Sequence, residues 1–154
     1  MAEVFLKKVI FSNKKRKIEI AKALRDKIDN LVENEYGEFC HFKKNLCGLC
    51  AISSLALKNG LEKKGFKSKA LMGKFLDEKG ITDHCWVEDE SSIFDITATQ
   101  FNIPDKVFVI DKKSEEAYWY QDGEVITEFS QFDQWPETQK PKNEICHMLI
   151  DSLF

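Results

Sequence analysis

An uncharged run from Leu46 to Leu57 (LCGLCAISSLAL) constrains the fold of this chain more than any other stretch. Because the whole chain is 32% charged, a run of this length without a single charge indicates a segment that is buried on all sides. Gly48 lies near its start, Gly65 follows it, and Asn59-Gly60 offers an earlier break. We therefore expect a central, buried helix that begins near Gly48 and ends by Gly65.

The segments that flank this run predict two further helices. Ser12 or Asn13 can cap the first of them. After this cap, apolar residues recur at helical spacing and predict a helix over about residues 13–32: Ile20, Leu24, Ile28 and Leu31. Residues 143–153 are expected to close the chain as a helix.

A set of strands is predicted after Gly65. Short stretches rich in strand-forming residues alternate with turn residues: 67–75, 81–88, 92–96 and 106–110. Two more stretches, 118–120 and 124–129, are joined by Gln121-Asp122-Gly123 and predict a hairpin. Because helices come first and strands follow, the chain is expected to be one α+β domain over residues 1–154. Its central helix would pack on a mainly antiparallel sheet.

Composition excludes several classes of protein. No apolar run reaches the roughly 18 residues that a membrane-spanning helix needs. The first residues, MAEVFLKKVIF, lack the continuous apolar core of a signal peptide. Five cysteines at irregular spacing do not form a disulfide framework, so we expect reduced thiols, a cytoplasmic location and no membrane partner.

The charge is unevenly distributed along the chain. Residues 1–80 hold 18 Lys and Arg against 10 Asp and Glu, whereas residues 81–154 hold 5 against 16. This distribution predicts a basic and an acidic side of one domain, with steering of a charged substrate as an alternative. The basic run at residues 14–17 has no interleaved aromatic residues or glycines. We therefore interpret it as a solvated helical turn and expect no nucleic-acid partner.

Cys50 is the candidate nucleophile. It lies two residues after Gly48, in the first turn of the expected central helix, where backbone N–H groups lack intrahelical acceptors. The positive end of a helix stabilises a thiolate, which is the reactive form of cysteine. The same N–H groups can donate to an oxyanion. The alternative interpretation is a buried, inert structural thiol.

His84 and Asp95 are the candidate partners of this thiol. They lie on two neighbouring predicted strands, and an antiparallel turn near Glu90-Ser91 would bring their side chains together. An imidazole can hold a cysteine as thiolate and move protons, and a carboxylate can fix the tautomer of that imidazole. The sequence therefore predicts a catalytic triad of Cys50, His84 and Asp95.

In this order and at these spacings, the residues resemble the transglutaminase-like branch of the papain-fold superfamily. That branch has a Gly-x-Cys at the start of its central helix and glycines at the end of the helix and in the next strand. A His-x-Trp-Val-Glu strand and an Asp-x-Thr strand follow. This chain matches the pattern at Gly48, Cys50, Gly65, Gly73, His84, Trp86, Val87, Glu88, Asp95 and Thr97. Cys50 together with SLAL at 54–57 is most similar to the small leader peptidases of lasso-peptide biosynthesis.

The resemblance covers residues 46–97 and implies a papain-like core that acts on an amide bond through a thioester. Cys50 would be the nucleophile, His84 the general base and then acid, and Asp95 the orienting residue. A peptidase or amidohydrolase is expected first, with a transglutaminase, deamidase or N-acyltransferase as alternatives, because one fold supports them all. No metal or organic cofactor is implied. Residues 98–154 match no part of the pattern.

The expected partner is a peptide or protein substrate. A small processing peptidase often needs a second protein that presents its substrate. The unmatched residues 98–154 are the candidate region for binding such a protein.

Four further residues are candidates for the lining of the site. Asn45 and Gln100 carry side-chain amides that can donate to an oxyanion. Cys47 is a rival nucleophile, or a thiol that pairs with Cys50 on oxidation. Trp86 is expected in the core or as a wall of the site.

Non-catalytic alternatives also remain open. A zinc site has enough ligands on paper: Cys40, His41, Cys47, Cys50, His84 and Cys85. The second C-x-x-C of a ribbon-type zinc site is missing, however, and Cys50 lies in an apolar helix. A C-x-x-C redox site would need a thioredoxin-like strand before the motif. A degenerate papain-fold binding module is the last alternative, against which the complete set of Cys, His and Asp argues.

Overall fold

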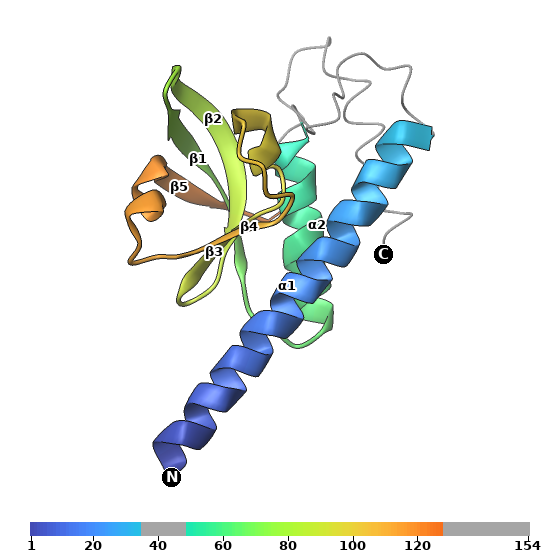
Figure 1. Cartoon of the computed structure of the whole chain (residues 1–154). Helices are drawn as coiled ribbons and strands as arrows, with labels where there is room; N and C mark the ends of the chain where they lie inside the picture. The colour runs from blue at the N-terminus through green and yellow to red at the C-terminus, as the bar shows by residue number, and fades with distance from the viewer. Residues whose placement is uncertain (35–48, 128–154) are drawn as a thin grey trace.

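The computed structural model describes residues 1–34 and 49–127. Two helices lie against one face of a five-stranded antiparallel sheet, so this part of the chain has an α+β fold (Figure 1). The strands lie in the order β4-β3-β2-β1-β5. The elements are α1 (Ala2–Asn34), α2 (Cys50–Lys63), β1 (Lys69–Asp77), β2 (Gly80–Glu88), β3 (Ser92–Asp95), η1 (Ala98–Phe101), β4 (Phe108–Asp111), η2 (Glu115–Trp119) and β5 (Tyr120–Ile126).

Helix α2 is the central helix expected from the uncharged run. All its residues from Ala51 to Leu57 are buried, including two serines. The helix ends at Lys63, and Gly65 follows with a φ of +83°, the left-handed conformation in which glycine commonly terminates a helix. The prediction of a buried helix between Gly48 and Gly65 is therefore confirmed.

The two faces of the sheet carry different cores. On the helical face, α1 and α2 pack against residues such as Cys85 and Val87 of β2. On the opposite face, Trp86 of β2 belongs to a second, aromatic-rich cluster with Leu71, Phe75, Ile93 and Tyr120. Because successive residues of a strand point to opposite faces, His84 shares the face of Trp86, and its ring lies 6.3 Å from the indole ring.

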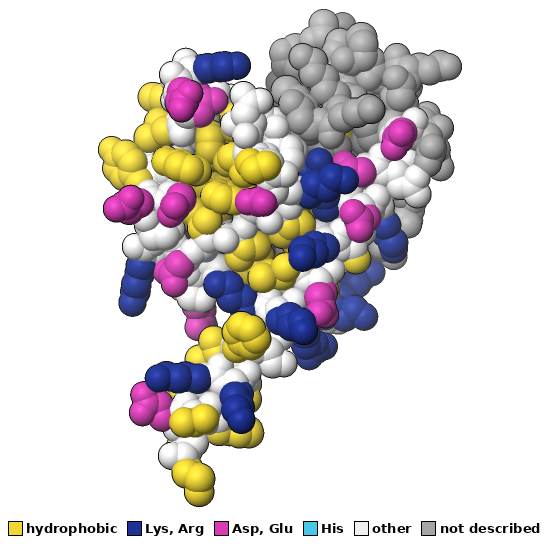
Figure 2. Space-filling model, in the orientation of Figure 1, with side chains coloured by type: hydrophobic (Ala, Val, Ile, Leu, Met, Phe, Trp, Pro, Cys, Tyr) yellow, Lys and Arg dark blue, Asp and Glu magenta, His cyan; other side chains and the backbone are white. Residues whose placement is uncertain are grey.

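Helix α1 is longer than expected. It begins at Ala2 rather than near residue 13, because residues 2–12 contain neither glycine nor proline that would stop a helix. The apolar spacing used for the prediction marks only the packed part, in which Ala21, Leu24 and Ile28 are buried. The first turns project beyond the sheet (Figures 1 and 2), and their large apolar side chains are exposed: Val4, Phe5, Leu6, Val9, Ile10 and Phe11.

One residue of the basic run in α1 has a structural role. The ammonium of Lys17 lies 2.8 Å from Asp89 Oδ2, in an ion pair of which both side chains are mostly buried. The other carboxylate oxygen of Asp89 accepts hydrogen bonds from the backbone N–H groups of Ser91 and Ser92. Lys17 therefore ties α1 to the turn between β2 and β3, and the interpretation of this residue as part of a solvated turn is wrong.

The predicted hairpin at residues 118–129 is also wrong where the structure describes it. Residues 115–119 form the 3-10 helix η2, and Tyr120–Ile126 is one strand that pairs with β1. Asp122 has a φ of +54°, and the register with β1 shifts between Met72 and Lys74, so Asp122-Gly123 forms a bulge. Turns and bulges need the same left-handed backbone, which explains why this sequence suggested a turn.

Other strand boundaries differ from the predicted ones by one or two residues. The predicted strands 67–75 and 106–110 are found at 69–77 and 108–111. The predicted closing helix at 143–153 lies outside the described residues. Within the described part of the chain, no helix is both long and apolar enough to cross a membrane.

Gly73 of β1 provides room for Trp86. A Cβ at this position would lie 2.3 Å from the carbonyl oxygen of Gln121 and 2.6 Å from Cη2 of Trp86. We expect Gly73→Ala to lower the free energy of unfolding by roughly 1–3 kcal/mol, because the ring and β5 must move. Urea denaturation would measure this loss. Lys69→Ala, at an exposed position of the same strand, should change it by less than about 0.5 kcal/mol. A Gly73→Ala variant as stable as the wild type would contradict this packing.

Candidate active site

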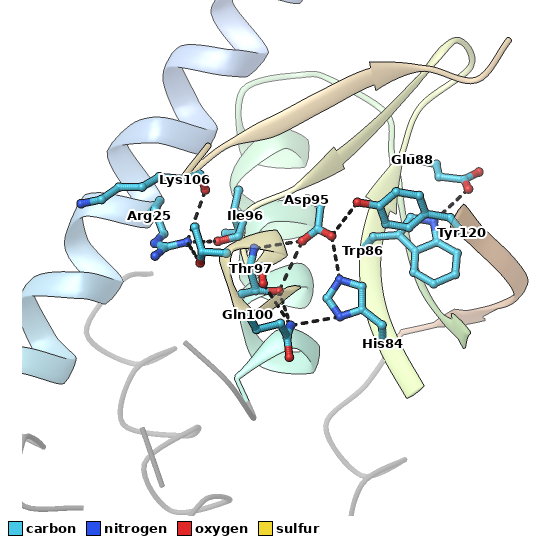
Figure 3. Close-up of polar contacts among 11 residues, drawn as sticks. Arg25, His84, Trp86, Glu88, Asp95, Ile96, Thr97, Gln100, Lys106 and Tyr120 are labelled. Atoms are coloured by element: carbon cyan, nitrogen blue, oxygen red, sulfur yellow. Dashed lines mark hydrogen bonds and ion pairs between the residues drawn. The ribbon is translucent and has the colours of Figure 1, made fainter. Parts of the chain in front are cut away.

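The His84 and Asp95 side chains meet as the two strands predict. His84 Nε2 lies 2.7 Å from Asp95 Oδ2, and the side chains are 0% and 1% exposed (Figure 3). Strands β2 and β3 are paired at Val87–Phe94 and Glu88–Ile93, which places residue 84 diagonally across from residue 95. The expected contact between these two residues is therefore confirmed, whereas their roles remain predictions.

The Asp95 carboxylate accepts four hydrogen bonds. Oδ1 accepts from the backbone N–H of Thr97 at 2.9 Å and from its hydroxyl at 3.3 Å. Oδ2 accepts from His84 and from the Tyr120 hydroxyl at 2.8 Å. Burial alone would raise the pKa of Asp95, but the positive charge on His84 and these donors keep it below its ordinary value. Asp95 is therefore held as a carboxylate.

Tyr120 is a member of the site that the sequence did not indicate. It lies 25 positions after Asp95, at the start of β5, and was interpreted as part of a hairpin. Burial and the neighbouring Asp95 carboxylate raise the pKa of Tyr120, so the hydroxyl keeps its proton and remains a donor. Only the pairing of β5 with β1 brings this side chain to Asp95, so no local sequence pattern would have found it.

His84 carries a positive charge over most of the accessible pH range. Burial favours the neutral imidazole, but the Asp95 carboxylate outweighs burial and, together with Cys50, raises the pKa of His84 to about 10. The ring is enclosed by aromatic side chains, with centroids 4.8 Å from Phe101 and 5.7 Å from Phe75. This apolar enclosure strengthens the attraction between His84 and its charged partners.

Cys50 is the first residue of α2 and is half-buried. Hydrogen bonds from the Cys85 thiol and from His84 lower the pKa of Cys50 well below its ordinary value, although burial opposes this change. The residue before the helix is Leu49, whose side chain has no oxygen to cap the helix. Leu49 therefore places no side-chain cap on the first N–H groups of α2, which can donate to an anion beside the Cys50 sulfur.

Gln100 lies at the other ring nitrogen of His84. Its Nε2 is 3.2 Å from His84 Nδ1 and donates to the carbonyl oxygen of Thr97 at 3.0 Å (Figure 3). This arrangement uses both amide hydrogens only when His84 Nδ1 carries no proton. Protonated His84 donates from Nδ1, and the amide must then turn its oxygen towards the ring.

Trp86 lies in the buried aromatic cluster beside His84, which confirms the first of its two expected positions, the core. It is almost fully buried, and its indole N–H donates to Glu88 Oε1 at 2.9 Å. Two other expected lining residues, Asn45 and Cys47, lie outside the described residues, as do Cys40 and His41 of the zinc alternative. Among residues 1–34 and 49–127, no three His, Cys, Asp or Glu side chains are grouped so that they could hold a metal ion.

Arg25 of α1 stabilises the segment that follows β3, and the sequence did not indicate this role. It is 1% exposed, and its Nη1 donates to the carbonyl oxygen of Ile96 at 2.6 Å and to the Thr99 hydroxyl at 3.1 Å (Figure 3). Its Nε donates to Asp29 at 2.9 Å. Arg25 therefore fixes the segment that carries Thr97 and Gln100.

No protein-family model, no curated protein and no solved structure matches the chain. The site therefore has to be interpreted from its own geometry.

Proposed function

We propose that this protein is a cysteine-dependent acyl-transfer enzyme with a papain-like, transglutaminase-type core, and that it acts on an amide bond through a thioester. The observation that carries the proposal is the buried pair of His84 and Asp95 beside a thiol at a helix start. The pKa of Cys50 is lowered and that of His84 is raised, so thiolate and imidazolium coexist between these two values.

In the proposed reaction, the Cys50 thiolate attacks the carbonyl carbon of the substrate. The electrons of the C=O bond move to oxygen, and the first N–H groups of α2 donate to this oxyanion. When the carbonyl re-forms, the C–N bond breaks, and the imidazolium of His84 gives its proton to the leaving amine. A thioester on Cys50 and a neutral His84 remain.

His84 then acts as a base on the second reactant. It takes a proton from water as the water attacks the thioester, and the C–S bond then breaks. The products are a carboxylic acid, the Cys50 thiolate and the protonated His84. If an amine attacks instead, the product is a new amide. Asp95 keeps the imidazole in the required orientation throughout. We propose hydrolysis as the main outcome, hence a peptidase or amidohydrolase.

A pocket next to His84 supports a peptide or protein substrate. It has a volume of about 630 Å³ and lies between the β1–β2 turn, η1 and η2. Phe75 and Phe101 line it and also contact the His84 ring, and Tyr118 and Trp119 line its other side. Figure 2 shows apolar side chains gathered on this face with acidic side chains among them. An apolar side chain of a peptide fits such a pocket.

A pH-graded pulse of iodoacetamide tests the thiolate. We expect Cys50 to be alkylated rapidly well below neutral pH, because its lowered pKa keeps it ionised there. Raising the pH above 10 deprotonates His84 but leaves the thiolate, so the alkylation rate should not fall. In His84→Ala, the rate at pH 6 should drop roughly tenfold or more, since one pKa unit changes the thiolate fraction about tenfold.

Two controls accompany this pulse. Peptide mapping of all cysteines should show Cys85 unlabelled, because its hydrogen bond to Cys50 and its burial raise its pKa. A p-nitrophenyl ester should then transfer one acyl group to Cys50, and either water or an added amine should release it. Protection of Cys50 until a chelator is added would instead show a zinc-stabilised binding module. A reactive Cys50 that accepts no acyl group would indicate a degenerate one.

A further inference from the structure

Cys85 is a second thiol beside Cys50 that the proposed reaction does not use. It follows His84 on β2 and is 3% exposed. The Cys85 thiol and its backbone N–H lower the pKa of Cys50, and the neighbouring Cys50 raises the pKa of Cys85. Cys50 in turn packs against the buried cluster that contains Cys85, and both cysteines are free thiols. The two sulfur atoms therefore belong to one cluster at the start of α2.

The packing of α2 on β2 explains why Cys85 lies near Cys50. Within the described strands, β3 pairs with β2 only at Val87 and Glu88. Cys50 is the first residue of α2 and packs against the cluster that contains Cys85 of β2. His84 and Cys85 point to opposite faces of β2, and both lower the pKa of Cys50.

The two thiols differ in reactivity and in access. Cys50 is half-buried and is the one held as thiolate, whereas Cys85 is buried and keeps its proton. A small oxidant therefore reaches and oxidises Cys50 first. A neighbouring thiol then decides between a disulfide, which can be reduced, and further oxidation to a sulfinic acid, which cannot.

We propose that Cys50 and Cys85 form a redox modification site, in which a hydroperoxide oxidises Cys50 and Cys85 resolves the product as a disulfide. The proposal rests on the proposed function only through the reactive thiolate of Cys50. It adds a regulation to that site: the disulfide removes the nucleophile, and reduction restores it.

Both steps balance. The Cys50 thiolate attacks an oxygen of the hydroperoxide, the O–O bond breaks, and Cys50 becomes a sulfenic acid while hydroxide or alkoxide leaves. The sulfur of Cys85 then attacks the Cys50 sulfur, the S–O bond breaks, and the proton of Cys85 leaves with the oxygen as water. Overall, two thiols are oxidised and the peroxide is reduced. A dithiol reductant reverses the disulfide by exchange.

The test treats the full chain with hydrogen peroxide and then maps its cysteines by mass spectrometry. It uses the wild type and a variant in which Cys40, Cys47 and Cys146 are all changed to Ser. We expect both proteins to lose two hydrogens and to yield a Cys50–Cys85 cross-linked peptide. Alkylation and acyl capture at Cys50 should disappear together, and dithiothreitol should restore both.

Two substitutions of Cys85 separate its roles as resolving thiol and as donor. Cys85→Ser keeps an O–H donor, so Cys50 should still be alkylated at pH 6 at nearly the wild-type rate. The same variant has no second sulfur, so peroxide should carry Cys50 to a sulfinic acid that dithiothreitol does not reverse. Cys85→Ala lacks the donor as well, and its alkylation rate at pH 6 should fall below that of the Ser variant.

Three results would overturn the proposal: a disulfide between Cys50 and Cys47 as the main product in the wild type, sulfinic acid on Cys50 despite an intact Cys85, or full recovery of Cys85→Ser. The proposed function fails separately. If the protein captures acyl groups but forms no Cys50–Cys85 disulfide, the proposed enzyme activity is supported and the redox site is not. If it forms this disulfide but captures no acyl group, the redox site is supported and the proposed enzyme activity is not.

Discussion

Asp95→Asn is expected to lower activity by roughly 10²- to 10⁴-fold, although it changes the shape of the side chain very little. The carboxylate accepts hydrogen bonds at both oxygens, two at Oδ1 from Thr97 and two at Oδ2 from His84 and Tyr120. An amide has only one accepting oxygen. In either orientation of the substituted side chain, its NH₂ group would face a donor, so the present network cannot form.

The loss of charge acts on the nucleophile through His84. Without the carboxylate, burial lowers the pKa of His84, and the imidazolium no longer stabilises the Cys50 thiolate. We therefore expect the alkylation rate of Cys50 at pH 6 to fall together with turnover, roughly tenfold or more. The two readouts are the pH-graded iodoacetamide pulse and the release of acyl groups from a p-nitrophenyl ester.

Tyr120→Phe is the matched control for Asp95→Asn. It removes one donor to Asp95 Oδ2 but leaves the carboxylate and its contact with His84. We expect a rate within about tenfold of the wild type, because His84 and Thr97 still donate the other three hydrogen bonds to the carboxylate. Wild-type alkylation in Asp95→Asn would mean that the thiolate is stabilised by the helix start and Cys85 alone.

The sequence predicted the parts of the site that local patterns determine. Cys50 follows from the start of one helix, and the approach of His84 and Asp95 follows from two strands joined by a short turn. Each of these inferences needs only the periodicity of one element and the direction of the next. The α+β arrangement and the buried central helix could be predicted for the same reason.

The missed residues depend on contacts between distant segments. Arg25 lies outside the apolar spacing of α1, where a sequence pattern indicates exposed, charged residues. It is buried because the segment after β3 packs over it. Tyr120 reaches Asp95 only because β5 pairs with β1 at the far side of β2. Cys85 was considered only as a zinc ligand, since no sequence pattern shows that Cys50 packs against the cluster that contains it.

The errors in the predicted elements have a similar origin. A sequence pattern reports which residues are packed, so it could not reveal the first turns of α1, which are helical but exposed. Asp122-Gly123 provides a left-handed backbone, and whether that conformation makes a turn or a bulge depends on the strand that pairs with it. Tertiary structure determines both features.

Arg25→Met should destabilise the fold more than any other single change considered, by roughly 3–5 kcal/mol, the cost of removing one partner from a buried charged network. Methionine has a similar length but no donors. The carbonyl oxygen of Ile96 and the hydroxyl of Thr99 would lose the guanidinium in a site that excludes water. Asp29 would keep Lys106, 3.2 Å away, as its other cation.

Lys22→Met is the matched control, because it makes a similar change at an exposed position of the same helix and should alter stability by less than about 0.5 kcal/mol. Urea denaturation of both variants would measure the difference. Arg25→Lys should fall between them, since an ammonium keeps the charge but cannot reach Asp29 and Ile96 at once with the geometry of the guanidinium. If Arg25→Met matched Lys22→Met, α1 would not be fixed to the segment behind the site. The support inferred for Thr97 and Gln100 would then have to come from the sheet alone.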